Sequence, residues 1–135
     1  MSSGYALDTD TCVWALRGDT RVLGRLRSVS PSSVFVTAMT LAELRFGVLK
    51  SRDPQANLAR VSMFLGPLTV LDFAAAAALA HAEIRWALRQ SPIGDRDLVI
   101  TAVARAHGLT LVTGNSREFD CVPNLPVEDW TRCAG

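Results

Sequence analysis

Tyr5-Ala6-Leu7 followed by Asp8-Thr9-Asp10 is the stretch that decides the fold. The three apolar residues predict a short buried strand, which ends at the polar residues that follow. Residues 11–17 then have the pattern of a helix, capped by Asp10 or Thr11. A strand that runs straight into a helix is typical of a βαβ unit, and it leaves the first carboxylates of the chain at the C-terminal end of the strand.

The alternation of strands and helices continues along the chain. Further strands are predicted at residues 34–36, 68–71 and 109–112, with a turn at 114–116 and a short extended tail at 122–129. Helices are predicted at 19–27, 41–50, 55–65, 73–90 and 95–107, with caps at Thr40 and Asp72 and a stop at Gly108. This order predicts a three-layer α/β/α fold around a central, mainly parallel, twisted sheet.

The composition predicts one domain over residues 1–135. Of these residues 49% are hydrophobic and 20% charged, which suits a buried core and excludes a disordered chain. No repeat or linker divides the chain. The most apolar stretch, residues 68–80, is interrupted by Asp72, so we expect no membrane-spanning helix. Residues 1–5 contain no basic residue of the kind that opens a secretory signal, and we expect a cytoplasmic protein.

Acidic residues recur where the predicted strands end and where helices begin. The carboxyl ends of parallel strands meet at one edge of a sheet, so we expect these side chains to face one cleft. Carboxylates gathered in one cleft repel each other unless a cation is present, and their hard oxygens select Mg²⁺ or Mn²⁺. The sequence therefore predicts a divalent-metal site built from Asp8, Asp10, Glu43, Asp95, Asp97, Asn115 and Glu118.

Some of these acids also have a purely structural explanation. Glu43 lies three residues after Thr40, so it could serve only as the glutamate of a capping box. Asp95 or Asp97 could do no more than compensate the positive end of a helix, and Asp10 could be a simple cap.

Histidine and cysteine offer no competing chemistry. His81 and His107 have no metal-ligand spacing between them. The cysteines are odd in number and widely spaced, without a C-x-x-C pair: Cys12, Cys121 and Cys133. We expect all five residues to be structural or incidental.

Several segments together carry a family resemblance. They read LDTDTC at residues 7–12, TLAELRFG at 40–47, PIGDRDLVI at 92–100, LVTGNSREF at 111–119 and VEDW at 127–130. In this order, and over nearly all of the 135 residues, the chain resembles the PIN-domain family, and more narrowly the VapC-type toxins of bacterial toxin-antitoxin pairs.

The resemblance implies a metal-dependent endoribonuclease. The invariant acids of the family map to Asp8, Glu43 and Asp97, which would hold Mg²⁺, with Mn²⁺ as a substitute. Asn115 stands where many PIN domains carry Asp, and related toxins with Asn there keep an acid three residues later, which is Glu118 here. Glu118 is therefore the expected fourth catalytic acid.

This chain departs from the family pattern at two positions. Asp10 stands where Asn is usual, and Asp95 stands where a neutral residue is common. Both departures add negative charge at the mouth of the expected site.

The expected partners are RNA, an antitoxin and a second copy of the chain. Arg45, Arg96 and Arg117 lie beside the acids in the sequence and are candidates for phosphate contacts, and Asn115 is a further candidate for substrate binding. The substrate should be single-stranded or looped RNA, and the toxin subgroup points toward transfer RNA. The resemblance also implies a cognate VapB-like antitoxin that covers the acidic cleft, and a homodimer. A mean hydropathy of +0.21 agrees with apolar surface covered by such partners.

Two other readings compete. A phospho-accepting receiver domain also places acids at the ends of parallel strands, but it needs a lysine after the last strand, and Lys50, the only lysine, lies in a predicted helix. A catalytically silent PIN-like binding module would be expected to lose a core acid, whereas Asp8, Glu43 and Asp97 are all present. Metal binding separates this second alternative from a nuclease.

Overall fold

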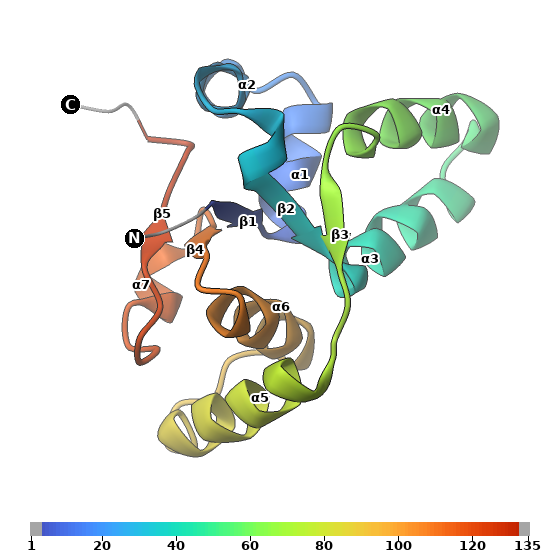
Figure 1. The fold of residues 1–135 in the computed structure, drawn as a ribbon. Helices are drawn as coiled ribbons and strands as arrows, with labels where there is room; N and C mark the ends of the chain where they lie inside the picture. The colour runs from blue at the N-terminus through green and yellow to red at the C-terminus, as the bar shows by residue number, and fades with distance from the viewer. Residues whose placement is uncertain (1–3, 133–135) are drawn as a thin grey trace.

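The sheet at the centre of the molecule is entirely parallel. The computed structural model describes residues 4–132 (Figure 1). Its five strands lie in the order β3-β2-β1-β4-β5. They are β1 (Tyr5–Leu7), β2 (Val34–Thr37), β3 (Thr69–Leu71), β4 (Thr110–Val112) and β5 (Val127–Glu128). The predicted three-layer α/β/α fold is confirmed, and the strand order reverses between β1 and β4, which is where open parallel sheets bind their ligands.

Helices connect the strands and cover both faces of the sheet (Figure 1). In chain order they are α1 (Thr9–Leu16), α2 (Thr20–Ser28), a short 3-10 helix (Pro31–Ser33), α3 (Ala38–Leu49), α4 (Pro54–Leu65), α5 (Ala75–Ala87), α6 (Asp95–Ala106) and α7 (Ser116–Phe119). None of the helices within residues 4–132 has the length and apolar character needed to cross a membrane.

Two hydrophobic cores lie on opposite faces of the sheet. Successive strand residues point to opposite faces, so Ala6 packs with α5 and α6 while Leu7 packs with α1 to α4. In β4, Leu111 and Val112 divide in the same way. Strands buried on both faces read as continuous apolar runs, which is the pattern that predicted them.

Three helices begin two or three residues away from the predicted position, whereas the starts of α2 and α4 differ from prediction by one residue. Helix α1 begins at Thr9, and its cap is Asp8, whose Oδ1 accepts the Thr11 N–H at 2.9 Å. Helix α3 begins at Ala38 with Thr37 as its cap, so Thr40 lies inside the helix. Both caps have extended backbone because each is continuous with a strand, and the helix follows without a loop.

The third correction concerns the Ala-rich helix α5, which begins at Ala75 rather than after Asp72. Its N-cap residue, Ala74, makes no side-chain cap hydrogen bond, and Asp72 lies outside the helix. Residues 72–74, which have no regular secondary structure, separate β3 from the helix and move its start. The predicted turn after β4 leads into the one-turn helix α7, which begins at its last residue, and the extended tail adds β5 to the sheet edge.

A glycine fixes the position of α1 against the end of β4. A Cβ on Gly114 would overlap the ring of Trp14, so only glycine allows the two elements to pack this closely. The segment after Gly114 carries Asn115 and Glu118. The contact therefore positions a predicted part of the site against α1, whose N-cap is Asp8.

Candidate active site

The predicted acids come together at the carboxyl edge of the sheet. Asp8 follows β1, Glu43 projects from the second turn of α3, and Asp97 lies in the first turn of α6. They line a depression of about 470 Å³, which we call the acidic depression. Its lining residues are Asp8, Thr9, Asp10, Glu43, Gly94, Asp95, Arg96 and Asp97.

Asp8 is the most enclosed of these carboxylates, with 6% of its surface exposed. Burial raises its pKa, while hydrogen bonds from Thr113 and Thr11 act in the opposite direction. Because Asp8 also caps α1, the side chain cannot turn away from the site without leaving a helix N–H unpaired. Asp8 is thus a fixed acceptor at the floor of the depression.

Asp97 carries the clearest electrostatic signal. Partial burial and the negative charges of neighbouring acids raise its pKa to about 6. The contributing acids, in decreasing order, are Asp8, Glu118, Asp10 and Glu43. Glu118 therefore lies within electrostatic reach of the site from α7, where it accepts a hydrogen bond from the Asn115 side-chain amide. Such mutual repulsion is what a bound cation would relieve.

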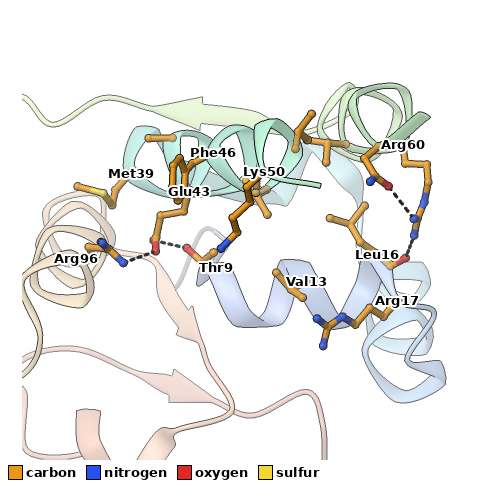
Figure 2. A pocket seen from close by; sticks show the side chains of 16 residues that line it. Thr9, Val13, Leu16, Arg17, Met39, Glu43, Phe46, Lys50, Arg60 and Arg96 are labelled. Atoms are coloured by element: carbon orange, nitrogen blue, oxygen red, sulfur yellow. Dashed lines mark hydrogen bonds and ion pairs between the residues drawn. The ribbon is translucent and has the colours of Figure 1, made fainter. Parts of the chain in front are cut away.

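Glu43 has both of its oxygens engaged, as Figure 2 shows. The Thr9 hydroxyl donates to Oε1 at 2.7 Å, and Arg96 Nη1 lies 3.7 Å from Oε2. Because α3 begins before Thr40, Glu43 is not in a capping box, and the structural explanation considered for it is wrong. Its carboxylate faces the depression instead.

The donor set fits a hard divalent cation. All the acidic side chains of the depression offer carboxylate oxygens, the ligands that Mg²⁺ and Mn²⁺ prefer. Within residues 4–132, no three acidic, histidine or cysteine side chains form a ready-made coordination group. Mg²⁺ is usually bound through one or two carboxylates and keeps several waters, so this more open arrangement still suits it.

The remaining predicted residues divide between the rim and the surface. Arg96 and Asp95 are exposed and line the rim of the depression. Arg45 and Arg117 are exposed on α3 and α7 and line neither the depression nor the groove described below. Asp10 is also exposed; it lies in the first turn of α1 and is not the cap, and its charge acts on Asp97.

The histidines and the described cysteines do not line the acidic depression, although burial and the nearby Asp8 charge raise the pKa of Cys12. His81 packs edge-on against Phe73, and His107 ends α6. Cys12 and Cys121 are free, and Cys133 lies outside the described residues.

Threonines were the functional neighbours that sequence reasoning missed. Thr11 and Thr113 bond Asp8, and Thr9 bonds Glu43. Their common signal is position, since Thr9 and Thr11 lie in the first turn of the helix that follows β1, and Thr113 directly follows β4. A hydroxyl placed at a strand end beside predicted carboxylates is available to orient them.

A second hollow of about 730 Å³ adjoins the acidic depression (Figure 2). We call it the apolar groove. Helices α1, α3 and α4 form its walls, with apolar side chains from Val13, Leu16, Met39, Phe46 and Val61 and basic ones from Arg17, Lys50, Arg60 and Arg96. Thr9, Glu43 and Arg96 line both hollows.

Comparison with known proteins agrees with this geometry. The PIN-domain profile matches residues 5–125. The tRNA(fMet)-specific endonuclease VapC of Salmonella typhimurium is 35% identical over 128 residues, covering 93% of this chain and 97% of the relative. Ribonuclease VapC2 of Rickettsia felis is 35% identical over 132 residues, covering 95% of this chain and 98% of the relative.

Solved structures give the same result. The DNA-bound VapBC of Salmonella typhimurium matches with a TM-score of 0.88 and 34% identity, covering 96% of this chain and 99% of that chain. VapBC2 of Rickettsia felis bound to a promoter DNA fragment matches with a TM-score of 0.87 and 34% identity, covering 93% and 98%. The chain therefore belongs to the PIN-domain family, among its VapC-type ribonucleases.

Proposed function

We propose that the protein is a cytoplasmic, Mg²⁺-dependent endoribonuclease that acts as the toxin of a VapBC pair. The observation that carries the proposal is the carboxylate cluster at the switch point of the sheet, where burial and four other acids raise the pKa of Asp97 to about 6. PIN-domain ribonucleases are generally metal-dependent. The similarity to VapC ribonucleases favours this function over the receiver domain and the silent module.

We assign the residue roles as follows. Asp8 and Asp97 hold the metal, and Glu43 binds it directly or orients a bound water. Glu118, kept in place by Asn115, completes the acidic shell. When bound, a divalent cation supplies activation of water and neutralisation of the phosphodiester charge. Arg96, exposed on the rim, contacts a phosphate of the substrate.

The substrate we propose is single-stranded or looped RNA, with transfer RNA as the first candidate. An exposed, bendable backbone can approach a depression crowded with acids, whereas a stacked duplex cannot. The relatives from Salmonella typhimurium and Shigella flexneri are named tRNA(fMet)-specific endonucleases. Initiator transfer RNA is therefore the substrate to test first.

The products distinguish this chemistry from metal-free cleavage. Attack of water on phosphorus breaks the P–O3′ bond and leaves a 5′-phosphate and a 3′-hydroxyl, whereas attack by the 2′-hydroxyl leaves a cyclic phosphate. The test incubates purified protein and transfer RNA with Mg²⁺, with Mn²⁺ or with excess EDTA, and maps the ends. Cyclic-phosphate ends, or full activity in EDTA, would contradict the proposal.

The apolar groove is the docking site that we propose for a cognate VapB-like antitoxin. Phe46 is 64% exposed, and the basic residues Arg17, Lys50 and Arg60 stand beside the apolar side chains. This combination suits an amphipathic segment that carries acidic side chains. Because the groove continues into the acidic depression at Glu43, a segment seated there would also obstruct the acids.

We propose that the homodimer interface lies on the outer face of α5. Leu79 and Trp86, seven residues apart on this helix, are 68% and 67% exposed. Large apolar side chains that share one exposed helix face are typical of contact surfaces. Molar mass in solution tests this placement: Trp86→Glu should yield monomers, and an unchanged mass would move the interface elsewhere.

A further inference from the structure

Two threonine hydroxyls and the Glu43 carboxylate form a chain that joins α1 to α3. Thr9 Oγ1 lies 2.7 Å from Glu43 Oε1 and 3.2 Å from Thr40 Oγ1. Thr40 is fully buried, and the Thr9–Glu43 hydrogen bond is partly buried. The arrangement lies where the acidic depression meets the apolar groove (Figure 2).

The chain has a direction. A threonine hydroxyl has one proton to donate, and the ionised carboxylate can only accept. Thr9 gives its proton to Glu43, so Thr40 must be the donor to Thr9. Successive hydrogen bonds that run in one direction polarise one another, which strengthens the final bond to the carboxylate.

Arg96 contributes less to the orientation of Glu43 than the hydroxyls do. Its guanidinium lies 3.7 Å from Oε2, and its side chain is 74% exposed. An ion pair with such an exposed partner is screened by solvent and holds the carboxylate only weakly in one orientation. The directed hydroxyls are therefore the interaction that fixes the rotation of the carboxylate.

We propose that Thr40 and Thr9 form a hydroxyl relay that holds the Glu43 carboxylate in one orientation at the edge of the acidic depression. Both threonines are then positioning residues for RNA cleavage, an inference that rests on the proposed function. Thr9 sits at the first position of α1 and Thr40 near the start of α3, so the relay also links the helix that Asp8 caps to the helix that carries Glu43.

The test compares threonine variants in Mn²⁺ binding, measured by calorimetry without RNA, and in kcat and KM for transfer RNA cleavage. Thr9→Val keeps the shape and removes the hydroxyl. We expect about a 10-fold loss of Mn²⁺ affinity and a similar fall in kcat, the lower end of what partners of metal ligands typically contribute. KM should not change, because Thr9 touches the carboxylate and not the RNA.

Further variants separate the relay from general packing. Thr9→Ser keeps the hydroxyl and should restore affinity and kcat. Thr40→Val leaves Thr9 in place and removes only the polarising bond, so its loss should be smaller than that of Thr9→Val. Thr101→Val is the matched control, because the Thr101 hydroxyl is buried and has no hydrogen-bond partner among the described residues. It should behave as the wild type does.

The outcomes distinguish the relay from the function on which it rests. A wild type that neither binds Mn²⁺ nor cleaves RNA overturns the proposed function. A wild type that does both, with Thr9→Val and Thr40→Val matching it in affinity and kcat, overturns the relay alone. Equal losses in Thr9→Val and Thr9→Ser overturn it too. Thermal unfolding of each metal-free variant is followed, and Thr40→Val decides the question if Thr9→Val does not fold.

Discussion

The acidic depression and the apolar groove are neighbours of opposite character. The depression, of about 470 Å³, is lined by five carboxylates, while the groove, of about 730 Å³, has apolar walls and basic side chains. Both are lined by Thr9, Glu43 and Arg96. Negative charge is thus concentrated in the depression, whereas the groove offers apolar surface that a partner can bury. Glu43 is the one acid that lines both.

The difference lies in how the side chains are held. In the depression, Asp8 is fixed as a helix cap, and Glu43 is bonded by Thr9. In the groove, Phe46 and Lys50 are exposed, and the Lys50 ammonium lies over the Phe46 ring. Metal binding requires carboxylate oxygens that are held in place, whereas docking of a partner requires a complementary surface. Substitutions in the two hollows should therefore have separable effects.

The largest effect is expected from Asp97→Asn and Asp8→Asn. Each should lower RNA cleavage by more than about 100-fold, since even the outer partners of metal ligands can contribute that much. Asparagine also caps helices, so Asp8→Asn keeps α1 intact. With less carboxylate repulsion, both metal-free variants should unfold at the wild-type temperature or slightly above it. Cleavage assays and thermal unfolding measure the two quantities, and antitoxin binding in the groove should persist. Retained cleavage, or lost activity caused by unfolding, would contradict the site.

The second prediction tests the frame that both hollows share. Gly114→Ala places a methyl group against Trp14 and should lower the free energy of unfolding by about 2 kcal/mol, as overpacking typically does. Gly24→Ala in α2 is the matched control. Its added Cβ meets no atom within 4 Å, so it should stabilise the helix by about 0.5–1 kcal/mol. Urea unfolding measures both, and an unaffected Gly114→Ala variant would show that the contact does not hold α1 in place.

The third prediction isolates the groove. Phe46→Ala should weaken antitoxin binding by about 10-fold, in the range of a moderate interface residue. RNA cleavage by the free protein should stay at the wild-type rate, because Phe46 lines the groove and not the depression. Calorimetric titration with the cognate antitoxin gives the affinity. Undiminished affinity would remove the groove from the interface.

Much of the site was predictable because the order and direction of the strands determine where the site residues lie. Once residues 5–7 and 109–112 are assigned as parallel strands, Asp8 and the segment after β4 must lie at the same edge. The structure has them there, with Tyr5 paired to Thr110. Glu43 and Asp97 follow from the same rule, since the helices that carry them begin near that edge.

The predicted helix starts were wrong where a local capping pattern competes with a strand that runs directly into the helix. Thr40 followed by Glu43 has the pattern of a capping box, but β2 runs directly into α3, so Thr37 becomes the cap. The threonine relay also escaped prediction, because its hydroxyls are brought together by packing of α1 on α3. Arg45 and Arg117 were proposed from proximity in sequence; both are exposed and line neither hollow, and their contact with phosphate stays a prediction.

The smallest effect is a dependence of stability on pH. The pKa of Asp97 is raised from 3.8 to about 6 in the folded protein, so between these values the folded state binds more protons than the unfolded state. The stability that Asp97 contributes to the metal-free protein is therefore fully present below pH 3.8, and it is lost as the pH rises through about 6. The raised pKa of Asp8 acts with the same sign.

Asp97→Asn removes one of these titrations, and comparison with the wild type isolates it. Asp97 is partly exposed, so solvent screens it, and we expect the difference in Tm between pH 5 and pH 7.5 to change by no more than about 4 °C. Saturating Mg²⁺ should reverse the trend in the wild type, because the cation binds the ionised carboxylates and gains affinity as they lose protons. Thermal unfolding across this pH range, with and without Mg²⁺, measures both effects. Parallel pH profiles for the wild type and Asp97→Asn would mean that the acids of the depression do not repel one another. That result would remove the electrostatic basis for a cation in the depression, but it would not bear on the groove.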